Sequence, residues 1–318
     1  MEYRNLGNSG LRVSTLGLGC NSFGGRMDLA ASKKVVDKAI DLGVNFFDTA
    51  DIYGGGGKSE SVLGEAIGSR RPQVVLATKF GMAMPDDRGE SRGSRRYVVS
   101  AVENSLRRLK TDWIDLYFMH APDPSTPIEE TLRALDDIVR QGKVRYIGCS
   151  NFAAWQVTEA AWTAKLANLH GFIASQEEYN LVARGVEQQV MPALNAAKMG
   201  LVPYFPLAGG LLTGKYARNA AAPAGTKFAN PGMKWLVDQY VNDANWSIVE
   251  ALNKYCDSQR LEIIDAAFAW LLDHSQVASV IAGASHPEQV ERNLKAVGTK
   301  LSPEVRTELD KITARKPG

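Results

Sequence analysis

Four residues in the first half of the chain are of types that together can move a proton: Asp48, Tyr53, Lys79 and His120. A free tyrosine has a pKa of about 10 and is a poor acid or base unless its phenolate is stabilised. A lysine ammonium beside Tyr53 would lower that pKa, an aspartate would hold the lysine charged, and a histidine would hydrogen-bond the reacting oxygen. Reduction of a carbonyl by hydride needs this combination, because a proton must reach the oxygen as negative charge develops there.

The elements that must position these residues are short apolar runs. Asp48 ends the run VNFFD and leads to Tyr53, Lys79 ends VVLATK, and His120 ends WIDLYFMH. In a closed parallel barrel the carboxyl ends of all strands meet at one rim. One polar residue at a strand end means little, but polar residues that end three consecutive runs predict a common pocket.

Runs of this kind alternate with segments of helical periodicity. Apolar residues three or four apart indicate helices at 31–43, 94–110, 127–142 and 186–200. The alternation predicts a (β/α)8 TIM barrel with strands at 14–20, 44–50, 74–80, 113–120, 144–150, 173–180, 201–208 and 277–285. An open doubly wound sheet is the alternative, but its glycine fingerprint is incomplete, because Ser22 stands where the third glycine belongs.

No linker-like segment divides the chain, so we expect a single domain over residues 1–318. The first residues read as a hairpin joined at Asn8-Ser9-Gly10, which would close the bottom of the barrel. Two long insertions, 81–96 and about 209–242, follow strands, so we expect both to lie over the C-terminal mouth.

Composition limits the classes of partner. The 318 residues carry 37 Lys and Arg against 35 Asp and Glu, and this net charge of +2 provides no broad basic field for nucleic acid or anionic lipid. The three cysteines, Cys20, Cys149 and Cys256, show no spacing typical of disulfides or zinc sites. No signal-peptide pattern and no apolar stretch of about 18 residues is present. We therefore expect a cytoplasmic protein without a membrane span.

The sequence also resembles a known family. The stretches DTADIYGGGGKSESVLGEAI at 48–67, ATK at 77–79 and LYFMH at 116–120 closely resemble the aldo-keto reductases, and the similarity extends from LGNSGLRVSTLGLG to GASHPEQVERN. The resemblance implies an NADPH-dependent reductase of aldehydes or ketones on a (β/α)8 barrel. It also implies that Tyr53 is the proton donor and that Asp48, Lys79 and His120 complete a catalytic tetrad.

Cofactor contacts are implied by the same resemblance. Ser150, Asn151 and Gln176 match residues that hold the nicotinamide carboxamide, and Tyr204 matches a ring that stacks on nicotinamide. The remaining matches form a pyrophosphate loop and an adenosine clamp: Pro206, Leu207, Ala208, Gly209, Gly210, Leu211, Lys215, Gly283, Ser285, Gln289 and Asn293.

The residues after Ser285 bear on the nucleotide preference. Many relatives carry Arg or Lys after the serine that corresponds to Ser285, where this chain has His286, so Arg292 is the candidate for meeting the 2′-phosphate. NADPH/NADP+ is therefore expected, and NADH stays possible.

Several patterns have simpler interpretations. GGGGKS at 54–59 lacks the first glycine of a P-loop, because Ile52 occupies that position, so the glycines are expected to shape the turn after Tyr53. Among the histidines only His120 ends a strand run, which argues against a metal-dependent hydrolase. Cys149 is expected to be a small buried residue.

Two assignments concern surfaces. Phe23 and Met82 are candidates for a substrate wall at the mouth. Trp155 and Trp162 share a helix face, which we expect to pack on the barrel, with a homo-oligomer contact as the alternative.

A second function stays open. The chain also resembles the potassium channel β subunits, which bind a nucleotide on this fold and serve as redox-sensing regulatory partners. Those subunits typically carry Asn where this chain has His120, which favours turnover of a small-molecule carbonyl substrate.

Overall fold

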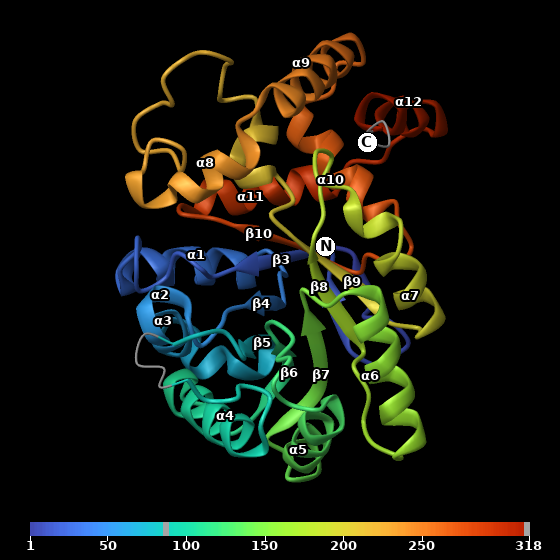
Figure 1. Ribbon diagram of the computed structural model, residues 1–318. Helices are drawn as coiled ribbons and strands as arrows, with labels where there is room; N and C mark the ends of the chain where they lie inside the picture. The colour runs from blue at the N-terminus through green and yellow to red at the C-terminus, as the bar shows by residue number, and fades with distance from the viewer. Residues whose placement is uncertain (85–88, 315–318) are drawn as a thin grey trace.

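Eight parallel strands form a nearly closed barrel in the computed structural model, which describes residues 1–84 and 89–314. Helices surround the strands (Figure 1). The order around the sheet is β10-β3-β4-β5-β6-β7-β8-β9, and Leu201 bridges Val277 to join the two ends. The barrel strands are β3 Leu16–Gly19, β4 Phe46–Asp48, β5 Val75–Phe80, β6 Ile114–Met119, β7 Val144–Ser150, β8 Ala174–Glu178, β9 Gly200–Tyr204 and β10 Val280–Gly283. Each overlaps a predicted run, and only β9 extends beyond its run, by the single residue Gly200, so the predicted barrel is confirmed.

The helices cover the outside of the barrel and connect its strands. They are α1 Leu29–Asp41, α2 Tyr53–Gly56, α3 Lys58–Ile67, α4 Arg95–Leu109, α5 Ile128–Arg140, α6 Ala154–Leu166, α7 Val190–Ala196, α8 Lys234–Tyr240, α9 Asp243–Ser258, α10 Ile263–Leu272, α11 Pro287–Val297 and α12 Pro303–Thr313. Short 3-10 helices are η1 Gly68–Gln73, η2 Gly185–Glu187, η3 Ala208–Thr213 and η4 Pro231–Met233. Each of the four predicted helical segments coincides with one of these helices, although α1 begins two residues earlier than predicted.

Alternation along each strand divides the core into two layers. On β4, Phe46 belongs to a cluster inside the barrel and Phe47 to the cluster between strands and helices. The inner cluster also contains Ala77, Phe118 and Val202. Because side chains on a strand alternate between faces, the residue two positions after an inner one also points inward. This rule places the site residues described below.

The N-terminal hairpin closes the bottom of the barrel, as predicted. β1 Tyr3–Asn5 pairs with β2 Arg12–Ser14 in antiparallel register, and Leu6 packs in the inner cluster. Gly7 has a φ of +56° and lies so close to the barrel that a Cβ there would be 2.4 Å from the carbonyl oxygen of Ile173. Only glycine suits this backbone and this space.

The second predicted insertion follows β9 and contains η3, η4 and α8. Gln239 on α8 donates to the carboxylate of Glu178 at the end of β8 at 2.8 Å, and Leu236 packs against Gly209. The segment therefore lies at the C-terminal mouth, above β10 and α11 in the view of Figure 1. The first insertion lies partly outside the described residues.

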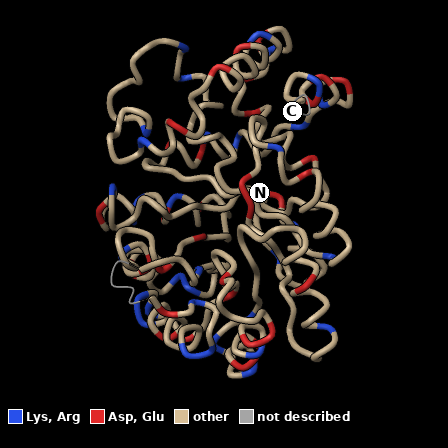
Figure 2. Tube along the Cα trace, in the orientation of Figure 1, with Lys and Arg blue, Asp and Glu red and all other residues tan. Residues whose placement is uncertain are grey.

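One surface prediction was wrong. Trp155 and Trp162 on α6 are 66% and 55% exposed, and Leu166 on the same helix is 82% exposed, so this face does not pack on the barrel. Lys, Arg, Asp and Glu are interspersed over the helices (Figure 2). Within residues 1–84 and 89–314, no helix combines the length and apolarity that a membrane span requires.

Candidate active site

Strand alternation delivers polar side chains to the C-terminal end of the barrel interior. Three inner residues, Phe46, Ala77 and Phe118, are each followed two positions later by a polar residue. Those polar residues are Asp48, Lys79 and His120, and the same rule from Gly148, Ala174 and Val202 gives Ser150, Gln176 and Tyr204. Neighbouring strands in parallel register therefore present all six side chains to one rim.

A buried ion pair forms the floor of the site. Lys79 is fully buried, and its Nζ donates to Asp48 Oδ2 at 2.7 Å and to the Thr49 carbonyl oxygen at 2.8 Å. Gln176 Nε2 donates to the other oxygen of Asp48 at 2.9 Å. A buried charge needs such partners, because removing an ion from water costs on the order of several kcal/mol when no partner offsets the loss. Asp48 and Lys79 are thus fixed from three strands.

Tyr53 lies above this ion pair. Lys79 Nζ is 4.9 Å from the centre of the Tyr53 ring, and the His120 ring centre is 5.7 Å from that of Tyr53. The turn that follows is built from four glycines, residues 54–57, with φ of 72°, 78°, 93° and 88°. Such consecutive left-handed residues require glycine. The glycine run therefore shapes the turn after Tyr53, as predicted.

The pKa values assign protons to the tetrad. Burial raises the pKa of Tyr53 above its ordinary value, while the Lys79 ammonium opposes that rise. The expected effect of the ammonium is therefore present, but burial outweighs it. Although burial opposes the charge on Lys79, Asp48 and Tyr53 together raise the pKa of Lys79. At neutral pH the site therefore holds a protonated phenol beside an ammonium.

His120 is neutral in this environment. Burial, followed by the Lys79 charge, lowers the pKa of His120 well below its ordinary value. Its Nδ1 is buried and has no hydrogen-bond partner among the described residues. A neutral imidazole carries one N–H, so His120 can donate a hydrogen bond to an oxygen beside Tyr53.

The residues predicted to hold a nicotinamide lie together at the ends of β7, β8 and β9. Ser150 Oγ donates to the Gln176 carbonyl oxygen at 2.7 Å, and Tyr204 Oη donates to Asn151 Oδ1 at 2.8 Å. Asn151 Nδ2 donates to the carbonyl oxygen of His120 at 2.9 Å. Tyr204 is partly exposed, so one edge of this platform is open to the mouth.

The predicted pyrophosphate loop has a backbone that few sequences adopt. Pro206 and Leu207 lead into η3, where Ala208, Gly209 and Gly210 have φ of 47°, 68° and 114°. Lys215 comes back over this turn, because a Cβ on Gly210 would be 3.4 Å from Lys215 Nζ. Close approach of backbone and a flexible cation is a suitable arrangement for a phosphate.

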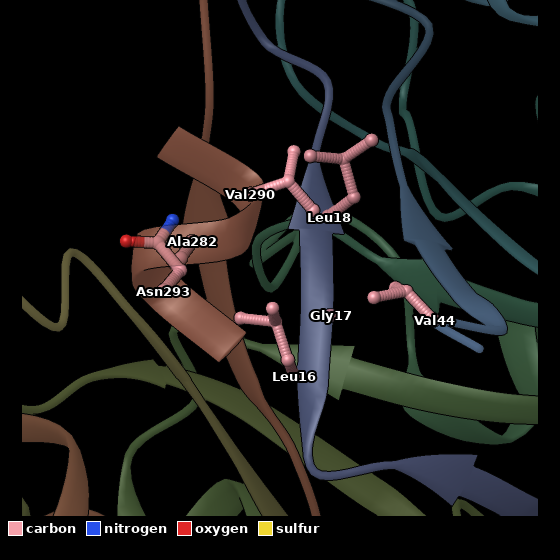
Figure 3. A pocket seen from close by; sticks show the side chains of 7 residues that line it. All are labelled: Leu16, Gly17, Leu18, Val44, Ala282, Val290 and Asn293. Carbon is pink, nitrogen blue, oxygen red and sulfur yellow. The ribbon is translucent and has the colours of Figure 1, made fainter. Parts of the chain in front are cut away.

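The predicted adenosine clamp surrounds the start of α11. Ser285 N donates to Gln289 Oε1 at 2.7 Å, so the first turn of α11 is tied to the residue before its N-cap, His286. Asn293 is buried, and Figure 3 shows it with Val290 beside Leu16 and Leu18 of β3, around a small apolar hollow. Gly283, at the end of β10, is exposed.

Arg292 differs from expectation in its contacts. Its guanidinium donates to Asp265 at 2.5 Å and to Glu262 at 2.7 Å. The charge predicted to meet a 2′-phosphate is therefore already balanced by two carboxylates.

Two cations that sequence reasoning missed lie near Lys215. Arg26 follows β3 and Lys227 follows η3, both in loops at the C-terminal mouth. Burial and the charges of Arg26 and Lys215 lower the pKa of Lys227 to about 8. Arg26, Lys215 and Lys227, here called the cation cluster, form no ion pair with any described carboxylate. Three mutually repelling cations together favour an anionic ligand, and a dinucleotide phosphate fits this group.

The burial of the side chains decides between interpretations of the remaining candidate residues, Phe23, Met82 and Cys149. Phe23 is completely buried, so its assignment to a substrate wall was wrong, whereas Met82 is partly exposed. Burial raises the pKa of the Cys149 thiol far above its ordinary value, in agreement with a structural cysteine. No cluster of three or more metal-ligating side chains occurs in the part of the chain that the structure describes.

Comparison with known proteins agrees with this geometry. Residues 15–314 match the model of the aldo/keto reductase family. A probable voltage-gated potassium channel subunit beta of Arabidopsis thaliana is 38% identical over 100% of this chain and 98% of its own length. The protein of the same description from Oryza sativa subsp. japonica is 37% identical with the same coverage. The uncharacterized oxidoreductase YrpG of Bacillus subtilis (strain 168) is 37% identical over 98% of this chain and 96% of its own length.

Proposed function

Because the chain belongs to the aldo/keto reductase family, we propose that it reduces aldehydes or ketones to alcohols with NADPH as the reductant. The observation that carries this proposal is the buried Lys79–Asp48 pair beneath the protonated Tyr53 phenol. The family match supports oxidoreductase activity and a nicotinamide cofactor in general terms. The choice of NADPH and of a carbonyl substrate is our proposal.

In the proposed reaction Tyr53 is the acid. NADPH, when bound, supplies a hydride to the carbonyl carbon. Tyr53 gives its phenolic proton to the carbonyl oxygen, so one O–H bond breaks as the alcohol O–H forms, and solvent later returns the proton to Tyr53. The Lys79 ammonium stabilises the phenolate that is left. The neutral imidazole of His120 orients the carbonyl by donating its N–H.

The remaining site residues hold the nucleotide in this proposal. Ser150, Asn151 and Gln176 bind the carboxamide, and the Tyr204 ring stacks on the nicotinamide. The η3 turn and Lys215 meet the pyrophosphate, to which we add the other two members of the cation cluster. The adenosine end takes the contacts of Gly283, Ser285, Gln289 and Asn293.

Location and assembly complete the proposal. We place the protein in the cytoplasm as one catalytic domain, and the free, buried state of Cys20, Cys149 and Cys256 supports a reducing compartment. The exposed apolar face of α6 supports a homo-oligomer.

A panel of aldehydes and ketones tests the function. Purified protein is expected to consume NADPH, followed by its absorbance, in the presence of a reactive aldehyde such as 4-nitrobenzaldehyde. Absence of turnover with every compound, while NADPH binds, would contradict a reductase.

That outcome would favour a second candidate, a nucleotide-binding regulatory subunit with little turnover. The observation behind it is the 38% identity to a protein described as a potassium channel subunit beta. The presence of His120 beside Tyr53 argues for the reductase, because a binding subunit does not need a donor to a reacting oxygen.

A further inference from the structure

An unassigned carboxylate lies directly behind the proposed nicotinamide platform. Glu177 follows Gln176 on β8 and therefore points out of the barrel, towards the helix layer, where it is only 5% exposed. Ser175, on the same face, donates its hydroxyl to Glu177 Oε1 at 2.5 Å. Buried glutamates are rare unless they are paired, and no described cation is paired with this one.

The partners of Glu177 are backbone N–H groups of the turn between β7 and α6. The backbone amides of Phe152 and Asn151 lie close enough to its carboxylate to oppose, together with the Ser175 hydroxyl, the rise in pKa that burial causes. Asn151 has a φ of +62°, a left-handed conformation that costs a non-glycine residue about 1 kcal/mol or more. The carboxylate therefore fixes a turn that the backbone by itself disfavours.

The same turn carries the side chain that joins three parts of the site. Asn151 Nδ2 donates to the carbonyl oxygen of His120 and, at 3.1 Å, to Ser150 Oγ. Asn151 Oδ1 accepts the Tyr204 hydroxyl at 2.8 Å. Displacement of the Asn151 backbone would therefore move the carboxamide-binding amide and release the ring of Tyr204.

We infer that Glu177 is a positioning residue of the nicotinamide subsite, which acts through the backbone of Asn151. The inference rests on the proposed function, because it requires that this platform binds NADPH. Glu177 itself touches neither the substrate nor the cofactor in this assignment.

The electrostatics of Glu177 agree with that inference. Burial raises the pKa of Glu177 to about 7, against the opposing effects of the Ser175 hydroxyl and the two backbone amides. The titratable groups that face it are Cys149 on β7 and Tyr204 on β9, and both are neutral because burial raises the pKa of each. Above pH 7 the carboxylate is charged and holds the turn firmly, whereas below pH 7 the neutral acid is a weaker acceptor.

The charge on Glu177 is expected to have opposite effects on stability and on binding: as pH rises, it lowers the free energy of unfolding and strengthens NADPH binding. A carboxyl with a pKa raised in the folded state stabilises the fold below its ordinary pKa, and this contribution is lost as pH rises through about 7. The charged form of Glu177 therefore lowers the free energy of unfolding. A residue that serves only the fold would not show this opposition.

Isosteric replacement tests the inference. We expect Glu177→Gln to fold, to unfold at pH 8 at the same or a higher temperature than wild type, and to bind NADPH about fivefold more weakly at pH 8. At pH 6 the two proteins should bind NADPH equally. The 2′-phosphate also titrates in this range, but it affects both proteins alike, so the ratio of their dissociation constants reports on Glu177.

Two further variants complete the design. Glu177→Ala removes the carboxylate beside these two amides, and we expect it to weaken NADPH binding by about tenfold or more. Glu187→Gln is the matched control, because Glu187 accepts hydrogen bonds from Tyr179 and Arg184. It should lower stability and leave the pH dependence of NADPH binding unchanged.

The outcomes are distinguishable. A ratio of dissociation constants that stays at one from pH 6 to pH 8 for Glu177→Gln, in a wild type that binds NADPH and reduces aldehydes, overturns the role of Glu177 alone. A wild type that does not bind NADPH overturns both this inference and the proposed function.

Discussion

The cation of the proposed catalytic site, Lys79, and the cation cluster at the mouth of the barrel differ in burial and in ion pairing. Lys79 is fully buried and is held by Asp48 and the Thr49 carbonyl oxygen. The cation cluster lies in loops, where Lys215 and Arg26 are exposed and Lys227 is partly buried, with no ion pair to a described carboxylate.

This difference follows from what each cation is proposed to do. A charge that acts on Tyr53 must stay in place in every turnover, so it is fixed by partners on neighbouring strands. A charge that binds a phosphate gains most when no internal carboxylate competes for it. The pairing of a cation thus helps to separate catalytic from ligand-binding roles, and Arg292, with two carboxylate partners, groups with the structural cations.

The largest effect is expected at the paired region. Tyr53→Phe removes the proton donor but keeps the ring beside Lys79 and His120. We expect kcat to fall by about a thousandfold or more, while the NADPH dissociation constant changes by less than about twofold. Steady-state kinetics and NADPH fluorescence titration measure the two quantities, and unchanged turnover would contradict the proposed mechanism.

A second change contrasts the two regions in stability. Lys79→Met leaves the buried carboxylate of Asp48 without its cation, which is expected to lower the free energy of unfolding by about 3–5 kcal/mol. Lys227→Ala is expected to change it by less than about 0.5 kcal/mol or to raise it slightly. Urea unfolding at pH 7 compares the variants, and equal losses would remove the distinction between the regions.

A third change concerns affinity at the unpaired region. We expect Lys227→Ala to weaken NADPH binding by about tenfold and NADH binding by less. Lys234→Ala is a matched control on the same segment, because Lys234 is exposed and paired with Asp238. If Arg292→Ala has the larger effect, the 2′-phosphate contact belongs to Arg292 instead.

The smallest expected effect is a pH dependence. Because the pKa of Lys227 is lowered to about 8, its charge is lost as pH rises from 7 to 9, and NADPH binding should weaken about fivefold over that range. Lys227→Arg keeps its charge and should show a flatter profile. Identical profiles for the two proteins would mean that Lys227 does not contact the nucleotide.

The site residues at the ends of strands could be predicted from the sequence. Asp48, Lys79 and His120 end apolar runs, so their convergence follows from barrel geometry, whereas the role of Tyr53 depended on the family resemblance. The raised pKa of Tyr53 was not predictable, because it depends on burial by segments distant in the chain.

Loop residues were harder to predict. Lys227 lies in an insertion without periodicity, and only the folded loops bring it to Arg26 and Lys215. Glu177 reads as one of two adjacent glutamates, and its role appears only when strand alternation places it behind Asn151. Phe23 was misassigned because nothing in its local sequence distinguishes a buried loop residue from an exposed one.

Direct transfer of hydride to a carbonyl is the central claim, and isotope transfer tests it most directly. Protein is incubated with 4-nitrobenzaldehyde and NADPH that carries deuterium at both C4 positions, and the alcohol is analysed by mass spectrometry. We predict that each alcohol molecule gains one deuterium on the carbinol carbon and that the Tyr53→Phe variant forms almost none. Alcohol without deuterium, or no alcohol while NADPH is bound, would contradict the account.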